Sequence, residues 1–551
     1  MRFAYRSTTQ MAKQLSGRMR CGFSLVTEEI MQNILSRLPA LAFAYAACVN
    51  KRWYKICSQI LKRPKLASAL SLNPSLHKTN RAHQFLCYDC KDAVEEVIEQ
   101  VLSEPIRPHF AIACISKEFN LELTHGLIIK KLGSSIPIIT NIASGIIGVD
   151  GIADELYEEK WETTTAGPNS QDSDRVDRGL VLLVGFLPGL KIGTIPLLRP
   201  MQESNTLVDK FVMDILHYTS AVSDCPAPTG IIIFGDKTTD MKPIVSKMDC
   251  AMPEETVIVG DASANFIFRN GDNSLNHLAH TCYFQAVALV FARDRYKPEG
   301  IGEIQFHVTM SKGVMPFGPT LEAASVLQKD SECSWISAKL KGQNGIVAAG
   351  EILNDLKQQF RDANKSADIY IGVTKETIST NDSGIWTPGR CLDFYEVRGG
   401  GGRYFNVNGV GIQPGDSFLF YQSDSETASS TCDHAFNKLL ALKAELKSKN
   451  YLHLSKFADK DDKKEVLGGL IFSCYRRGES FFGDPFVDSY PFCDSFPTAP
   501  VAGLFCRGEI GRGPESLMNE EYEDVNSPRC CLHVYSTIYL VMSYLPPSVE
   551  N

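Results

Sequence analysis

Residues 24–64 constrain the fold more than any other segment, because helix signals follow one another there without a long connection. Thr27 is suited to cap a helix whose first turn holds Glu28 and Glu29, where carboxylates favour the positive helix end. One face of this helix is predicted to be apolar by helical spacing, with Ile30, Ile34, Leu35 and Leu38. Pro39 disfavours helical geometry at the preceding residue, so we expect this helix to end at Leu38.

Two further helices are predicted after Pro39. An apolar run covers residues 41–49, and Asn50 is suited to cap a third helix that carries Trp53 and Ile56 on one side. Three helices of this size bury little apolar surface and are marginal as an independent domain. We therefore expect a docking module whose apolar face is completed by a partner. An ordinary helical hairpin at the edge of a larger domain is the alternative that periodicity leaves open.

The order of these residues resembles an F-box. The resemblance is carried by Leu25, Ile34, Leu35, Leu38, Pro39, Val49, Lys51 and Trp53. The segment departs from the family at Val26, where a proline is usual, and at the apolar start of the second helix. The resemblance implies that these residues divide between the core of the module and a surface that binds a Skp-type adaptor, and through it a cullin. The chain would then be the non-catalytic substrate-recognition subunit of an SCF-type (Skp, cullin, F-box) ubiquitin ligase.

Composition narrows the class of the whole chain. For 551 residues we expect about two to four domains, and 44% hydrophobic with 22% charged residues indicate a globular protein. A net charge of −8 argues against a nucleic-acid partner, and no apolar run is long enough to predict a membrane span. Seventeen scattered cysteines suit free thiols in a reducing compartment, which favours the cytoplasm or the nucleus. Residues 1–23 are predicted to be a disordered basic tail, with an organelle transit peptide as the alternative.

Beyond the F-box the sequence predicts an α+β multidomain protein. We expect a helical connector over residues 65–107, an α/β domain over 108–302 and a second one over 303–545. Strands that are apolar throughout, such as residues 179–186, alternate with helices such as residues 121–132, which indicates a sheet covered on both faces. Residues 144–148 are expected to form a tight glycine turn, and the polar segment 161–178 to form a mobile loop.

The body also resembles a FIST module. The stretches GLIFSCYRRG from Gly469, GLFCRGEIG from Gly503 and LHVYSTI from Leu532 resemble its C-terminal half, and IPIITNIASGIIG from Ile136 resembles its N-terminal half. FIST modules are paired with F-boxes in some eukaryotic proteins and are proposed to sense small ligands such as amino acids. The resemblance therefore implies a small ligand as a partner besides an unknown substrate protein. Such proteins are sometimes labelled leucine-rich-repeat F-box proteins, but no L-x-x-L-x-L period is present, so we predict no solenoid.

The segment around Arg507 is the candidate ligand site outside the F-box. Gly508 and Gly511 would let the backbone approach a ligand closely. Arg507 would bind a carboxylate and Glu509 an ammonium group, a combination that suits an amino acid. The alternative is an Arg–Glu pair that stabilises a turn. The glycine segment 145–148 is the second candidate.

Other motifs give weaker signals. His77, His83, Cys87 and Cys90 have the spacing of metal ligands, but the pattern is unlike the common zinc classes and two unpaired thiols are favoured. Glycines at 399–402 and 409–411 predict turns between strands rather than a phosphate site. We find no catalytic triad and predict no catalytic residue, metal or cofactor. The rival hypothesis is a ligand sensor or enzyme without a ligase role, and adaptor co-purification that depends on residues 24–64 separates the two.

Overall fold

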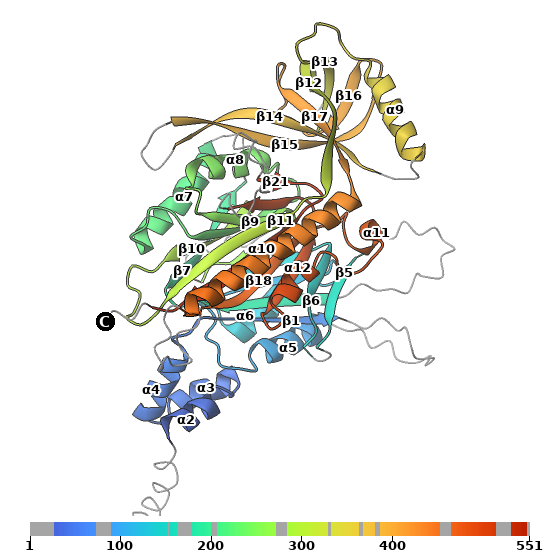
Figure 1. The fold of residues 1–551 in the computed structure, drawn as a ribbon. Helices are drawn as coiled ribbons and strands as arrows, with labels where there is room; N and C mark the ends of the chain where they lie inside the picture. The colour runs from blue at the N-terminus through green and yellow to red at the C-terminus, as the bar shows by residue number, and fades with distance from the viewer. Residues whose placement is uncertain are drawn as a thin grey trace, which may run out of the picture.

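The computed structural model describes residues 27–72, 90–151, 154–161, 179–199, 206–271, 284–328, 332–362, 367–380, 386–451, 464–513 and 531–547. Figure 1 shows three N-terminal helices at one end of the molecule, a small barrel at the opposite end and a layered body between them. The fold is therefore a three-helix module followed by a mixed body of helices and strands, as the sequence predicts.

The N-terminal helices are short and two of them are capped by side chains. They are α2 (Glu28–Leu35), α3 (Ala40–Ala47) and α4 (Lys51–Ile60). Thr27 Oγ1 accepts a hydrogen bond from the backbone N–H of Ile30 at 3.4 Å, and Asn50 Oδ1 accepts one from Trp53 at 2.9 Å. Both predicted caps are confirmed. The first helix ends at Leu35, earlier than expected, and Pro39 is instead the N-cap residue of α3.

The body consists of two sheets that pack face to face, with helices on the outer face of each (Figure 1). Apolar side chains from both sheets form one core between them, where the rings of Phe234 and Phe472 lie 6.4 Å apart. Burial of this apolar surface is the main force that holds the two layers together. The prediction of strands buried on both faces is thus confirmed, although one cover is a second sheet.

In the described residues, the larger sheet has ten strands and is mixed. Its order is β1 (Lys65–Leu72), β6 (Gly179–Phe186), β2 (Phe110–Ile115), β3 (Ile138–Ile142), β9 (Val257–Arg269), β8 (Gly230–Asp236), β10 (Phe284–Arg293) and β7 (Leu190–Leu198), with β20 (Glu509–Arg512) and β21 (Leu532–His533) joined beside β9. The pairs β2–β3 and β8–β9 are parallel. Four helices cover the outer face of this sheet: α5 (Cys90–Val101), α6 (Leu121–Leu132), α7 (Thr206–Val222) and α8 (Lys242–Ala251).

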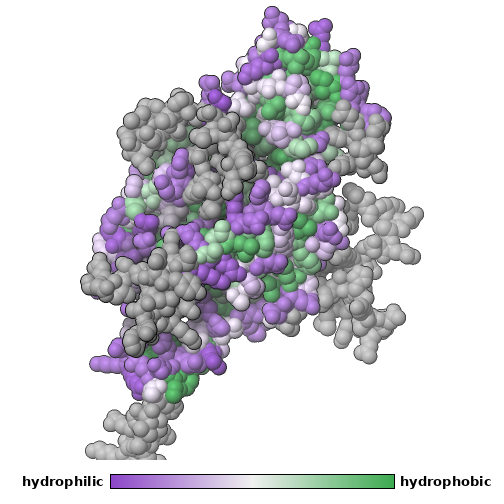
Figure 2. Space-filling model, viewed as in Figure 1, coloured by the Kyte–Doolittle hydropathy of each residue, from purple (hydrophilic) through white to green (hydrophobic). Residues whose placement is uncertain are grey.

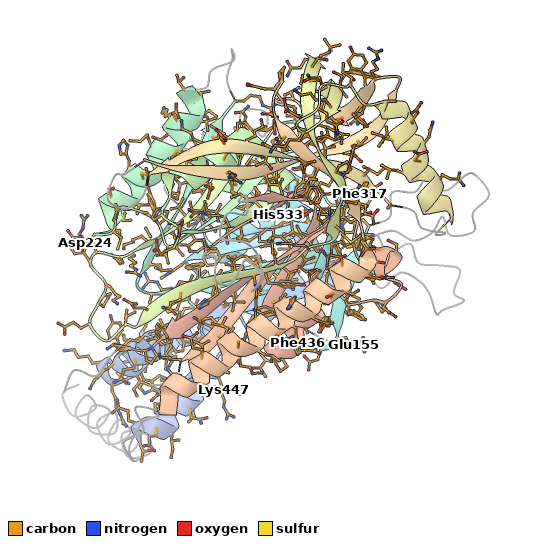
Figure 3. The ribbon with its side chains drawn as sticks, turned by 45° about the horizontal axis from the view of Figure 1, so that its top comes forward. Glu155, Asp224, Phe317, Phe436, Lys447 and His533 are labelled. Atoms are coloured by element: carbon orange, nitrogen blue, oxygen red, sulfur yellow. The ribbon has the colours of Figure 1, made fainter. Side chains whose placement is uncertain are left out.

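The smaller sheet has six strands in the part of the chain that the structure describes. Its order is β11 (Glu303–Ser311), β22 (Thr537–Leu545), β18 (Glu465–Cys474), β19 (Val501–Cys506), β4 (Gly145–Val149) and β5 (Leu156–Lys160), and β18 and β19 are parallel. Its outer face is covered by α10 (Ser425–Tyr451) and α12 (Tyr490–Ser495), and α11 (Glu479–Phe482) lies near the end of β18. In Figure 3, Phe436 and Lys447 mark the long helix α10, and Phe317 marks the barrel.

A closed six-stranded barrel is inserted between β11 and α10. Its order is β12 (Val314–Gln328), β13 (Cys333–Leu340), β16 (Tyr404–Asn408), β15 (Trp386–Gly401), β14 (Ile369–Thr380) and β17 (Ser417–Ser423), and α9 (Ala349–Asp362) packs against it. The ends of the insertion meet, because Val314 and Ser423 are paired and Asp424 N donates to Gly313 O at 3.0 Å. Of the predicted glycine turn at 399–402, Gly402 (φ +58°) lies in the β15–β16 turn, whereas residues 399–401 belong to β15 and pair with β16.

Each sheet contains strands from both the N-terminal and the C-terminal half of the chain. β4 from the first half pairs with β19 in the smaller sheet, and β20 from the second half pairs with β9 in the larger one. A boundary at residues 302 and 303 therefore does not separate the two sheets. The division into consecutive FIST-like domains stays a prediction.

Three local expectations need comment. Residues 65–72 form strand β1, which pairs with β6 along its length, so this part of the expected helical connector belongs to the larger sheet. Residues 145–149 form strand β4 instead of a tight turn. Most of the expected loop 161–178 lies outside the described residues. Among the described helices, none is both long and apolar enough to cross a membrane.

Candidate functional site

The core of the N-terminal module contains part of the predicted adaptor set. It is formed by Met31, Leu35, Phe43, Ala46, Ile56 and Cys57, none more than 6% exposed. Leu38 and Trp53 are half-buried at the edge of this core. The structure therefore assigns Leu35 to the interior and gives Leu38 and Trp53 one buried side each.

The same module exposes many large apolar side chains, and these form its candidate docking surface. Within the described residues, six of the 14 exposed large hydrophobic side chains belong to it: Ile30, Ile34, Leu41, Tyr45, Val49 and Tyr54, each at least 50% exposed. Figure 2 shows hydrophobic residues among hydrophilic ones at the lower end of the molecule, where this module lies. Exposed apolar surface of this density is typical of a protein-binding site.

The predicted docking residues are only partly placed as expected. Ile34, Pro39, Val49 and Lys51 are exposed, as a docking surface requires, whereas Leu25 lies outside the described residues. Ile30 and Ile34 do not lie on the buried face of α2, which is formed by Met31 and Leu35. Sequence reasoning missed Leu41, Tyr45 and Tyr54 as surface residues. The spacing of Leu41 and Tyr45, four residues apart, was the available signal for a second apolar row.

The module is joined to the body without a long linker. Only residues 61–64 separate α4 from β1. The backbone N–H of Ala40 donates to the carbonyl of Leu102 at 2.9 Å, and Lys65 forms an ion pair with Glu104. Ala40 and Leu61 also pack against the core beneath α5 and α6. The orientation of the module relative to the body is therefore fixed by hydrogen bonding and packing.

The two charged residues of the candidate ligand site, Arg507 and Glu509, do not meet around a ligand. Arg507 lies in the β19–β20 turn, with its guanidinium 4.4 Å from the ring centre of Tyr475, and it lines a cavity. Glu509 is fully buried, accepts a hydrogen bond from Ser536 Oγ at 2.9 Å and is not among the residues that line the cavity. The predicted ammonium-binding role of Glu509 does not fit this position.

Gly508 and Gly511 lie where a side chain would be strained or would clash with neighbouring atoms. Gly508 has a φ of +133°, and a Cβ there would lie 3.0 Å from Ala262 Cβ. A Cβ on Gly511 would lie 2.5 Å from Ile538 Cδ1. Both positions are therefore explained by backbone conformation and packing.

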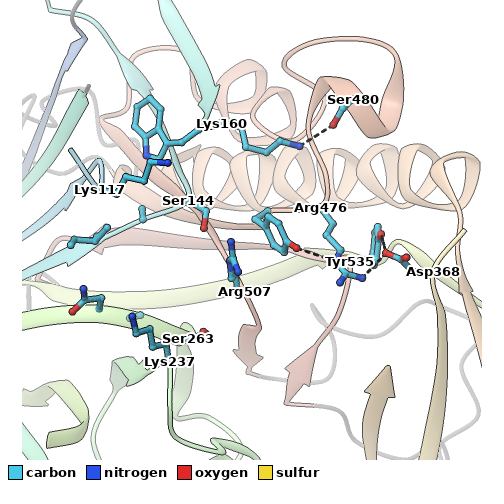
Figure 4. A pocket seen from close by; sticks show the side chains of 16 residues that line it. Lys117, Ser144, Lys160, Lys237, Ser263, Asp368, Arg476, Ser480, Arg507 and Tyr535 are labelled. Carbon is cyan, nitrogen blue, oxygen red and sulfur yellow. Dashed lines mark hydrogen bonds and ion pairs between the residues drawn. The ribbon is translucent and has the colours of Figure 1, made fainter. Parts of the chain in front are cut away.

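The cavity beside Arg507 has a volume of about 970 Å³ and lies where the two sheets and the base of the barrel meet. Figure 4 shows Lys117, Lys160, Lys237, Arg476 and Arg507 around it. The second candidate segment, 145–148, does not line it, although the preceding residues 142–144 do. Sequence reasoning found Arg507 but missed the four other cations, because they are dispersed over 360 residues of the chain (Lys117 to Arg476).

Two buried carboxyl groups lie behind the Arg507 turn. Burial raises the pKa of Glu509 from 4.5 to about 7, against the hydrogen bonds that Ser536 and Gly508 donate. Burial also raises the pKa of Asp261 from 3.8 to about 6, and the backbone N–H groups of Ser263 and Arg507 oppose this increase. Both groups belong to the protein interior and accept hydrogen bonds from backbone N–H groups, Glu509 from Gly508 and Asp261 from Ser263.

Most of the residues that have the spacing of metal ligands lie outside the described residues. His77, His83 and Cys87 lie outside the described residues, and Cys90 is buried at the start of α5. Within the described ranges, no group of three or more His, Cys, Asp or Glu side chains could hold a metal ion.

Comparison with known proteins identifies the N-terminal module. Residues 23–64 match the F-box domain model. The chain is also 36% identical, over 528 residues, to the F-box/LRR-repeat protein At5g63520 of Arabidopsis thaliana, and the match covers 94% of this chain and 93% of that protein. The chain belongs to the F-box protein family. In the part of the body that the structure describes, the strands form two sheets and a barrel, and no leucine-rich-repeat solenoid is seen.

This membership sets the general class of function. F-box proteins are in general substrate-recognition subunits of SCF ubiquitin ligases. Their F-box binds a Skp1-type adaptor and through it a cullin, and they act as non-catalytic adaptors.

Proposed function

We propose that this chain recruits a specific target protein to an SCF ubiquitin ligase, with the F-box docked on a Skp1-type adaptor and the body holding the target and a small ligand. The observation that carries the proposal is the density of exposed apolar side chains on an F-box that is fixed to a large, well-packed body. Transfer of ubiquitin is assigned to other subunits. The cytoplasm or the nucleus is the proposed location, because the adaptor must be reached there.

The resemblance of the body to a FIST module supports the ligand-binding part of the proposal. That resemblance rests on the sequence motifs around Ile136, Gly469, Gly503 and Leu532. The barrel is a further candidate for target recognition, because it lies at the end of the molecule remote from the F-box (Figure 1).

The docking surface is tested with variants that change its exposed residues and leave the core intact. Ile34→Glu and Tyr45→Glu place a charge at positions that are 50% and 68% exposed. Loss of one well-packed interface residue costs on the order of 2 kcal/mol or more, roughly a 30-fold weaker affinity. We expect each variant to lose the co-purifying Skp1-type adaptor. Leu38 and Pro39 are less suitable, because Leu38 also supports the F-box core.

Matched controls lie on the body. Leu123→Glu and Tyr296→Glu introduce the same charge at side chains that are 51% and 81% exposed. These controls are expected to bind the adaptor as the unchanged chain does. Retention of the adaptor by both F-box variants would contradict the docking proposal and favour the alternative, a ligand sensor or enzyme without a ligase role.

A further inference from the structure

We propose that the cavity beside Arg507 binds a small molecule that carries two or more anionic groups, phosphate or carboxylate. This inference deepens the ligand-binding part of the proposed function and concerns the body alone. It differs from the amino-acid hypothesis, because Glu509 is not available for an ammonium group.

The position of the cavity in the fold is the first argument. At least one strand of each described parallel pair ends beside it: Ile142 is the last residue of β3, and Lys117 follows β2, Lys237 follows β8, Arg476 follows β18 and Arg507 follows β19. Small-molecule sites in sheets that contain parallel strands lie outside the carboxyl ends of those strands. The volume of about 970 Å³ is at the upper end of the range for such sites.

The charge of the lining is the second argument. Five cations face one carboxylate, Asp368, and this carboxylate is already bound by Arg476 at 2.5 Å and by the hydroxyl of Tyr535. Arg476 also binds Glu396 at 2.7 Å, so it is neutralised within the protein. Among the described residues, neither Lys117 nor Lys237 forms an ion pair. Unpaired cations gathered in one cavity attract an anion with more than one charged group.

The hydrogen-bonding groups of the lining are the third argument. Ser144, Ser263 and Asn265 add neutral polar side chains to the cavity wall. Trp161 also lines it, and its indole N–H is buried without an acceptor in the described part of the chain. A buried N–H group without an acceptor lowers the stability of the protein. An anionic oxygen bound in the cavity would accept a hydrogen bond from it and remove this cost. Lys160 also lines the cavity, and its Nζ donates to the carbonyl of Arg477 at 2.6 Å and to Ser480 Oγ at 2.9 Å.

The test uses the full chain in complex with its Skp1-type adaptor and two chemical probes, pyrophosphate and citrate, which separate phosphate from carboxylate chemistry. Binding is measured by titration calorimetry, because both anions also stabilise proteins non-specifically by exclusion from their surfaces. We expect saturable binding of at least one probe and little binding of glycine, which carries a single carboxylate.

Two pairs of variants make the test specific. Lys117→Ala with Lys237→Ala removes two cations of the cavity, and Lys130→Ala with Lys210→Ala removes two exposed cations from α6 and α7 as the matched control. Each lost charge-assisted contact is expected to weaken the probe about tenfold or more. The control pair should bind the probe as the unchanged chain does.

Several results would overturn the inference. They are the absence of saturable binding of both probes, equal binding by the cavity variant, and binding of glycine as strong as that of the anions. Binding of a polyglutamate peptide but of neither probe would also overturn it, and would indicate an acidic segment of a target protein instead. Adaptor co-purification is scored on the same preparations, so failure of this inference with retained adaptor leaves the SCF proposal intact.

Discussion

Glu509 gives a quantitative test of the interior that supports the Arg507 turn. Its carboxylate is fully buried and accepts hydrogen bonds from Ser536 Oγ at 2.9 Å and from the backbone N–H of Gly508 at 3.2 Å. Burial raises its pKa from 4.5 to about 7, so the folded protein holds this proton more tightly than the unfolded chain does. We predict that Glu509→Gln, which cannot ionise, changes how the free energy of unfolding depends on pH.

The sign follows from proton linkage. Because the folded-state pKa is the higher one, the stabilising contribution is fully present below the unfolded pKa of 4.5 and is lost as pH rises through about 7. A pKa displaced from 4.5 to about 7 corresponds to roughly 3 kcal/mol of unfolding free energy. The unchanged chain should therefore lose about this much stability over that interval relative to the Gln variant.

The measurement is urea denaturation of both proteins across this pH interval. Glu158 and Asp261 also have pKa values raised by burial, to about 7 and about 6, but they are present in both proteins and cancel in the difference. Because Gln also replaces one acceptor oxygen by a donor, a constant offset between the two proteins is expected. A difference in stability that stays independent of pH would refute the assignment of a neutral, buried carboxyl at Glu509.

Two further predictions concern the smaller sheet and the barrel. Arg477 is fully buried and its Nε donates to Asp488 at 2.9 Å. Arg477→Met should destabilise the chain by about 3–5 kcal/mol, because it leaves the Asp488 carboxylate buried without its ion-pair partner. Adding Asp488→Asn should recover part of this loss, and denaturation of the single and double variants checks both predictions. Replacement of residues 314–423 by a short Gly-Ser linker should leave a cooperatively folding chain that still binds the adaptor, since the ends of the insertion meet; thermal unfolding and co-purification measure this.

Local signals predicted the elements better than their arrangement. The strand Gly179–Phe186 was predicted at the observed bounds from its apolar run, and the helix Leu121–Leu132 was also predicted at its observed bounds. The caps at Thr27 and Asn50 were predicted from side-chain chemistry alone. Pairings such as β4 with β19 join segments far apart in the sequence, and periodicity carries no information about which strands will be neighbours.

The sequence predicted that Arg507 and Glu509 would both face a ligand, but in the structure Arg507 lines the cavity and Glu509 does not. Arg507 and Glu509 were expected to act together because their opposite charges suit the carboxylate and the ammonium group of an amino acid. Gly508, with its positive φ, interrupts the strand between them, so Arg507 faces the cavity while Glu509 enters the interior beside Cys506. The other cations of the cavity could not be found from spacing, because strands of both sheets bring them together.

The arrangement of the cavity also limits how a ligand could influence the ligase. The F-box is followed directly by β1, the edge strand of the larger sheet, which is paired along its length with β6. The connection to the barrel is different, because it includes the ion pairs of Arg476 with Asp368 and Glu396 at the edge of the cavity. An anion that competes for Arg476 would loosen the barrel and leave the F-box in place. If the barrel recognises the target, as proposed above, control by a ligand would act there and leave adaptor binding unchanged.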